Sequence, residues 1–224
     1  MNLIKSREFF DPDSVESAIH IIGCGAIGST LAENLARLGF NKLHLYDFDT
    51  VSAHNIANQM FWEEHINKPK LDAVCEMLKK INPDIELITH PKGWQEGMTL
   101  SGYVFLCVDN IDTRRQIITE NKYNESILAV FDLRMRLTDA QHYAASWNNE
   151  ETKSQLFQSM NFTHEEAKNE TPMSACGTTL SVVYTVRAIT AYAVANLIKK
   201  IQDNKLYKLV LIDCADFNID AFEE

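Results

Sequence analysis

Three glycines near the N-terminus have the spacing of a phosphate-binding turn. Gly23, Gly25 and Gly28 form a G-x-G-x-x-G pattern between an apolar run and a helical pattern. The first glycine of such a turn allows a tight bend, the second lets the backbone approach a phosphate, and the third allows close helix–strand packing. The helix that begins at Ala26 offers unpaired N–H groups and a partial positive charge to an anion. The sequence therefore predicts a nucleotide-binding site without specifying the nucleotide.

Asp47 supports this interpretation because it stands about 20 residues beyond the glycines, at the end of the next strand pattern. A carboxylate at this place accepts hydrogen bonds from the ribose hydroxyls of a nucleotide. Strand, glycine turn, helix and second strand are expected at residues 18–22, 23–25, 26–38 and 42–46. A tight turn that binds nothing is the alternative that this pattern leaves open.

Further polar residues are expected at the same edge of the sheet, where parallel strands end. Lys70 stands early in a helical pattern, where the helix dipole disfavours a cation, so a phosphate explains it better than capping does. Asp109 directly follows a buried strand pattern and has the oxygen ligands that Mg²⁺ prefers. A solvated lysine and a capping or turn acid are the simpler alternatives for these two residues. The remaining candidates at this edge are Asp49, Asn55, Gln59, Asn110 and Arg114.

Composition narrows the class of protein. The net charge is −10 and no long basic cluster occurs, which argues against a nucleic-acid partner. Five widely spaced cysteines without a C-x-x-C pair indicate a reducing compartment and argue against disulfides and a zinc site. The longest apolar segment, 178–198, contains Arg187 and Asn196 and is typical of a buried helix rather than a membrane span. We therefore expect a cytoplasmic protein without zinc that binds neither nucleic acid nor membrane.

Alternating strand and helix patterns predict an α/β fold. We expect a Rossmann-like, mostly parallel sheet with helices on both faces and antiparallel strands near the C-terminal part. We also expect one domain over 1–224, with an N-terminal arm at 1–17 and a polar excursion or lid at 148–171. Further strands are expected at 85–89, 103–108, 127–131, 141–147 and 209–212, and further helices at 68–81, 112–122 and 178–198.

The ordered set of motifs resembles the ThiF/MoeB family, the adenylyltransferases related to ubiquitin-activating enzymes. The resemblance covers residues 18–131 well and the last helix loosely. It implies that ATP, with Mg²⁺, activates a carboxylate, which gives an acyl-adenylate and pyrophosphate. It also implies a substrate that ends in a carboxylate, typically the C-terminal glycine of a ubiquitin-like or sulfur-carrier-like protein, and a homodimer. The motifs that carry it are residues 23–28, 46–51, 55–59 and 107–110, together with Lys70.

This resemblance also assigns roles to single residues. It implies that Asp47 holds the ribose, that Asn55 and Lys70 contact the phosphates, and that Asp109 serves Mg²⁺. One departure concerns the phosphates, because Asn58 stands where the family motif has an arginine. An arginine elsewhere, such as Arg114, Arg7 or one from a partner chain, then replaces the missing charge, or adenylation is weakened or lost. The zinc-binding C-x-x-C pairs common in the family are absent as well.

Cys176 is the candidate for passing an acyl group to sulfur. It precedes the long apolar helix expected from residue 178, whose dipole would lower the pKa of its thiol. Family members that form such a thioester use a cysteine in a broadly similar region, whereas a buried small residue is the simpler interpretation.

Two other functions remain open. The glycines and Asp47 alone would suit an NAD- or FAD-dependent enzyme, and Asn58 would suit a non-catalytic nucleotide-binding subunit of a heteromeric enzyme.

Overall fold

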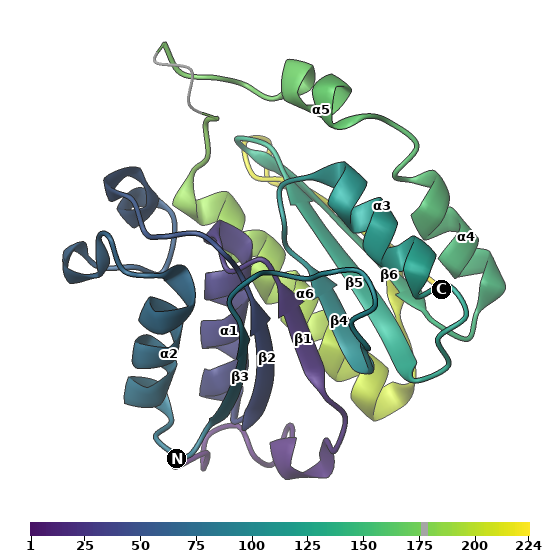
Figure 1. Ribbon diagram of the computed structural model, residues 1–224. Helices are drawn as coiled ribbons and strands as arrows, with labels where there is room; N and C mark the ends of the chain where they lie inside the picture. The colour runs from purple at the N-terminus through teal and green to yellow at the C-terminus, as the bar shows by residue number, and fades with distance from the viewer. Residues whose placement is uncertain (176–178) are drawn as a thin grey trace.

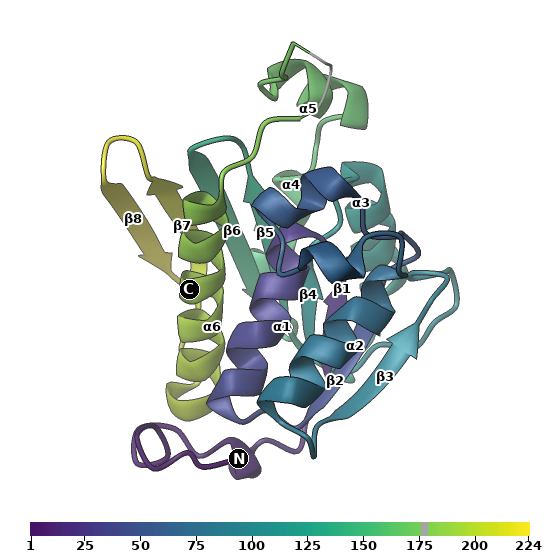
Figure 2. The same ribbon diagram turned by 90° about the vertical axis from the view of Figure 1, so that its left-hand side faces the viewer.

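The computed structural model describes residues 1–175 and 179–224. In these residues one eight-stranded sheet has the order β3-β2-β1-β4-β5-β6-β7-β8 (Figures 1 and 2). Strands β3 to β5 in this order are parallel, and β6, β7 and β8 are antiparallel to their neighbours. The strands are Ile19–Ile22 (β1), Lys42–Tyr46 (β2), Glu86–His90 (β3), Gly102–Leu106 (β4), Ile127–Met135 (β5), Asp139–Ser146 (β6), Tyr207–Asp213 (β7) and Asn218–Glu223 (β8).

Helices cover both faces of the sheet, as predicted. Helices α1, α2 and α6 lie on one face, and α3 and α4 lie on the other (Figure 2). The α-helices are Ala26–Leu38 (α1), Lys70–Ile81 (α2), Ile111–Glu120 (α3), Glu150–Gln158 (α4), His164–Glu170 (α5) and Val183–Asp203 (α6). Short 3₁₀ helices are Pro12–Ser14 (η1), Ala53–Ala57 (η2) and Glu63–His65 (η3).

Successive side chains of a strand point to opposite faces of the sheet, so each strand contributes to the core on both faces. Ile19 and Ile21 of β1 belong to the core beneath α1, whereas Ile22 belongs to the core beneath α3. In α6 the fully buried Val186, Ile189, Ala193 and Leu197 recur every three or four residues, so one stripe of the helix faces the sheet. Both periodicities explain why the sequence pattern predicts these elements.

The sheet reverses its strand order between β1 and β4. Strand β1 pairs with β2 on one side and with β4 on the other, so the chain leaves these strands in opposite directions. In open α/β sheets ligands bind in the crevice at such a point, beyond the carboxyl ends of the strands. The glycine turn follows β1, and the Cys107–Asn110 turn follows β4 at the same edge.

The C-terminal third differs in detail from the sequence expectation. The last helix begins at Val183 rather than near residue 178, and the acidic tail forms β8, which the sequence did not predict. Every residue of β8 is exposed, so no buried face gives it an apolar alternation. In the excursion 148–171, α4 buries Leu156, and α5 buries none of its residues. A lid role for this excursion stays a prediction.

The N-terminal arm packs at the edge opposite the glycine turn. Phe10 is buried and its ring lies 5.3 Å from that of Phe40, just after α1 ends, whereas Phe9 is exposed. Figure 1 places the N-terminus at the bottom, below the C-terminal end of α1. Phe10 thus anchors the arm, and Phe9 does not. Within the described residues, no helix has the length and apolar composition needed to span a bilayer.

Candidate nucleotide site

The glycine turn is closed by backbone contacts that only glycine permits. Gly23 has a φ of 95°, a conformation that favours glycine, and its N–H donates to the carbonyl of Tyr46 at 2.8 Å. A Cβ at Gly28 would lie 1.8 Å from the carbonyl oxygen of Gly23, so α1 packs directly on the turn. By contrast, a Cβ at Gly25 would meet no atom within 4 Å. The space above Gly25 is therefore open to a ligand.

Asp47 is fixed against this turn. One oxygen, Oδ2, accepts the N–H of Cys24 at 2.7 Å, and Oδ1 accepts the N–H of Asp49 at 2.8 Å. These two bonds hold the carboxylate beside the second residue of the glycine motif. The structure thus brings Asp47 and the glycines together, as their spacing predicted.

Lys70 and Asp49 form an ion pair at the same edge. The Lys70 Nζ lies 2.8 Å from Asp49 Oδ2, and the backbone N–H of Lys70 donates to the Asp49 carbonyl at 2.9 Å. The Lys70 side chain is only 9% exposed, whereas that of Asp49 is 52% exposed. A mostly buried ammonium with one carboxylate partner is well suited to bind a further anion.

Asn55 and Gln59 lie in the segment between β2 and α2. The buried Asn55 completes the capping box of η2, because its Oδ1 accepts the N–H of the cap residue Ser52 at 2.9 Å. The Oε1 of Gln59 is buried and has no hydrogen-bond partner among the described residues. A buried acceptor without a partner costs free energy, so a donor from a ligand would stabilise it.

Asp109 and Asn110 differ in their surroundings. Asn110 caps α3, because its Oδ1 accepts the N–H groups of Asp112 at 2.8 Å and Thr113 at 3.0 Å. Helix α3 therefore begins at Ile111, one residue before the bound expected from the sequence. Asp109 is exposed and makes no hydrogen bond or ion pair with any described residue. Asp109 follows β4, and β4 pairs with β1, the strand before the glycine turn. The Asp109 carboxylate is therefore available to a cation at this edge.

Arg114, unlike Asp109, is not available to a ligand. Its side chain is 6% exposed, and its guanidinium donates to the carbonyls of Leu106 and Val108 and to the carboxylate of Asp132. Asp132, which is fully buried, also accepts Nε of Arg134 at 2.6 Å. Arg114 therefore holds the end of β4 in place. Sequence analysis missed Asp132, although an acid directly after a buried apolar run is the same signal that identified Asp109.

Another predicted residue, Arg7, does not join the site. Arg7 lies in the N-terminal arm, where its guanidinium is 2.5 Å from Asp13 and 3.4 Å from Asp11. Cys176 falls outside the described residues, so its role stays a prediction.

Two other cysteines, Cys24 and Cys107, lie near the glycine turn, and their thiols are not reactive groups. Burial raises the pKa of Cys107 to about 12. Burial and the nearby Asp47 raise the pKa of Cys24 well above its usual value. Both residues lie in or beside strands of the core, as is typical of structural cysteines.

A stacked group of histidines lies on the face of β1, β2 and β3 opposite α1. The rings of His20 and His44 are 4.3 Å apart, and the ring of His90 is 3.9 Å from that of Tyr46. The Tyr46 hydroxyl lies 2.9 Å from Nδ1 of His20. Burial, together with the neighbouring histidines, lowers the pKa of His20 to about 3.

This depressed pKa predicts a loss of stability in acid. Below pH 6.5 the unfolded chain protonates His20 and the folded chain does not, so stability falls as the pH drops from 6.5 toward about 3. Between pH 7 and pH 5.5 we expect this histidine to contribute a loss of about 1 kcal/mol, measured by urea unfolding. In the His20→Asn variant, the difference between the two pH values should shrink by that amount. An unchanged difference would contradict the assignment.

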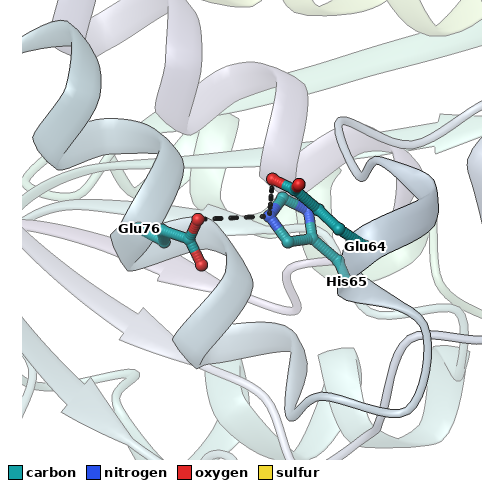
Figure 3. A group of neighbouring side chains, drawn as sticks. All are labelled: Glu64, His65 and Glu76. Atoms are coloured by element: carbon teal, nitrogen blue, oxygen red, sulfur yellow. Dashed lines mark ion pairs between the residues drawn. The ribbon is translucent and has the colours of Figure 1, made fainter.

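A second cluster has the composition of a metal site. Figure 3 shows Nε2 of the buried His65 facing Glu64 and Glu76, at 4.0 and 3.9 Å from their nearest oxygens. However, Nδ1 of His65 accepts the N–H of Trp62 at 3.1 Å, so the neutral ring carries its proton on Nε2. A protonated Nε2 cannot bind a metal, and Lys80 already lies 2.8 Å from Glu76. We interpret this cluster as packing of η3 against α2.

These contacts define an α/β domain with a candidate nucleotide site at the point where the strand order reverses. The chain belongs to the ThiF family, whose pattern matches residues 13–223. It is 30% identical over 145 residues to ubiquitin-like modifier-activating enzyme 5 of Drosophila virilis and 36% identical over 117 residues to that of Dictyostelium discoideum. These matches cover 55% and 45% of this chain but only 35% and 31% of the two relatives. The chain thus spans about a third of their length.

Solved structures show the same fold over nearly the whole chain. The crystal structure of E. coli MccB with ATP has a TM-score of 0.69 at 15% identity and covers 92% of this chain and 62% of that one. The structure of PaaA has a TM-score of 0.66 at 17% identity, covering 93% of this chain and 64% of that one. The Rossmann-like sheet with an antiparallel C-terminal part is therefore confirmed.

Proposed function

We propose that this protein is an ATP-dependent adenylyltransferase that activates a C-terminal carboxylate, with a ubiquitin-like protein or a peptide as the substrate. The observation that carries the proposal is the joint placement of the open glycine turn, Asp47 and Lys70 at one edge of the sheet. Membership of the ThiF family and the names of its relatives support this reaction over other uses of a nucleotide. One relative by fold, MccB, was solved with ATP and also with the peptide MccA.

The residues fit the parts of ATP in a definite order. The open space at Gly25 and the start of α1 would accept the phosphates, because N–H groups at a helix start bind anions. Lys70 would neutralise phosphate charge once its ammonium exchanges Asp49 for the ligand. Asp47 would bind the ribose with its remaining acceptor capacity. Asn55, Gln59 and Asn110 would border the ligand, in accord with the unpartnered Oε1 of Gln59.

The proposed reaction joins a carboxylate to the α-phosphate. A carboxylate oxygen of the substrate attacks the α-phosphorus, a P–O bond forms, and the bond to the β-phosphate oxygen breaks to release pyrophosphate. Asp109 would hold Mg²⁺, which offsets negative charge that develops on the phosphates. Arg114 would act as a positioning residue, because it fixes the Val108 carbonyl just before Asp109. We also propose a cytoplasmic, zinc-free homodimer.

The test is exchange of labelled pyrophosphate into ATP, combined with calorimetric titration of Mg·ATP and of NADH. The exchange assay is run with peptides and ubiquitin-like proteins that end in a free glycine carboxylate and with their amidated forms. We expect ATP binding, no NADH binding, and exchange that requires the free carboxylate. NADH binding without ATP binding would refute the proposal and favour a dehydrogenase.

Lys70→Ala is expected to reduce pyrophosphate exchange by about 100-fold. The substitution removes a charged hydrogen bond to phosphate, which contributes about 1.5–3 kcal/mol in comparable sites. Lys68→Ala is the matched control, because Lys68 precedes the same helix and pairs with Glu76 at 3.1 Å. Equal activity of the two variants would show that Lys70 does not contact the phosphates.

A second candidate function is a nucleotide-binding subunit without catalysis. Asn58 favours it, because this residue leaves the phosphate end with one positive charge fewer than the family motif has. Tight ATP binding without exchange, in a chain that co-purifies with a different, active subunit, is the result that would favour this function.

A further inference from the structure

The part of the proposed site that would bind the phosphates of ATP has few cations. Among the described residues, Lys70 is the cation that lies against the Asp47–Asp49 segment, and it faces Asp49. Three carboxylates are at this edge, including the unpartnered Asp109. The triphosphate of ATP carries about four negative charges, so one lysine and the Mg²⁺ proposed at Asp109 do not fully balance it. A second cation within reach of this segment would improve binding.

Arg187 on α6 is placed to supply that cation. Its Nη2 lies 2.8 Å from the sulfur of Met60, at the end of the segment that includes Asn55 and Gln59. Met60 in turn donates its N–H to Oγ of Ser29 at 3.2 Å, in the first turn of α1. Within residues 1–175 and 179–224, no other arginine hydrogen-bonds to the segment 53–62.

The bonds that hold Arg187 are easily exchanged. A thioether sulfur is a weak acceptor, so the guanidinium loses little when it leaves Met60. Its other partner is Glu33, at 3.0 Å, and Glu33 also pairs with Arg37 at 2.8 Å. When Arg187 moves, the largely buried Glu33 therefore keeps a positive partner. The Arg187 side chain is 46% exposed and has room to turn.

We propose that Arg187 binds the phosphates of ATP and replaces the charge that Asn58 lacks. This inference rests on the proposed nucleotide site. It assigns to α6, an element outside the nucleotide-binding motifs, a residue that contacts the substrate. It also explains how an acidic chain concentrates a second cation at the site without an arginine in the 55–59 motif.

The experiment compares Arg187→Gln with Arg37→Gln, which removes the other partner of the same carboxylate. We expect ATP affinity in calorimetry, and exchange where a carboxylate substrate supports it, to fall about tenfold or more in Arg187→Gln. We expect Arg37→Gln to bind ATP like the wild type. Thermal unfolding of both variants checks that they remain folded.

A double variant that moves the positive charge from Arg187 to position 58 distinguishes phosphate binding by Arg187 from a structural role. The double variant Asn58→Arg/Arg187→Gln should regain most of the lost affinity, because the arginine returns to the segment from a neighbouring position. Unchanged affinity in Arg187→Gln, or no recovery in the double variant, would overturn the inference. Wild-type protein that binds ATP but exchanges no pyrophosphate would refute the proposed enzyme and leave this affinity test of Arg187 valid. Wild-type protein that binds no ATP would overturn both.

Discussion

Replacing Asp132 with alanine is expected to lower the free energy of unfolding by about 3–5 kcal/mol, because it leaves two largely buried guanidinium groups without their carboxylate. Asp132 is fully buried and contacts both Arg114 and Arg134. The measurement is urea unfolding at pH 7, in which the wild type and the variant are fitted with the same m-value, the slope of unfolding free energy against urea concentration. The loss should extend to function, since Arg114 also bonds the Val108 carbonyl beside Asp109.

Asp139→Ala is the control for this loss. Asp139 also pairs with an arginine, Arg136, but both side chains are well exposed. Exposed pairs contribute little, so the change should stay within about 0.5 kcal/mol. Similar values for Asp132→Ala and Asp139→Ala would mean that the buried network does not stabilise the fold.

Two glycine substitutions in the same turn are expected to fail for different reasons. In Gly28→Ala the new methyl group would lie 1.8 Å from the Gly23 carbonyl oxygen, so backbone must move. We expect a loss of about 3 kcal/mol in unfolding free energy. Gly25→Ala meets no atom within 4 Å and should retain most of its stability, but its methyl group would occupy the space proposed for the phosphates.

Parallel measurements of thermal unfolding and ATP titration separate these effects. Gly28→Ala should show a lowered unfolding temperature, and Gly25→Ala should show ATP affinity reduced about tenfold or more at a nearly normal unfolding temperature. Normal ATP affinity in a folded Gly25→Ala protein would refute the phosphate position. A Gly28→Ala protein as stable as the wild type would show that α1 tolerates displacement from the turn.

The sequence predicts those parts of the fold in which one side of an element is buried. Helix α1 was predicted with its observed bounds, Ala26–Leu38, because its apolar spacing and the terminal Gly39 act together. Strand β8 was not predicted, since its order comes from hydrogen bonds to β7 and not from burial. Helix α4 was missed for a related reason, because a mostly polar helix depends on its Asn149 cap and one buried leucine.

In the candidate site, too, only contacts within one local unit could be predicted from the sequence. The spacing of the glycines and Asp47 predicts their proximity because one turn holds them. The partner of Arg114 could not be predicted, since it depends on how α3 packs over β5, and the approach of Arg187 to Met60 depends on how α6 crosses α1. Interactions within one βαβ unit are readable from spacing, whereas those between distant elements require the packed structure.

The strand order also sets when the proposed site can form during synthesis. Strand β1 pairs on one side with β4, whose first residues follow it by more than 80 positions, as in the pair Ile19 and Tyr103. The glycine turn packs on Cys107 and Val108, directly after β4. A nascent chain therefore carries its whole glycine motif early but lacks the complete proposed nucleotide site until β4 and its following turn have left the ribosome. Until then, the apolar edge of β1 is open to other chains, and chaperone binding is expected at that stage of translation.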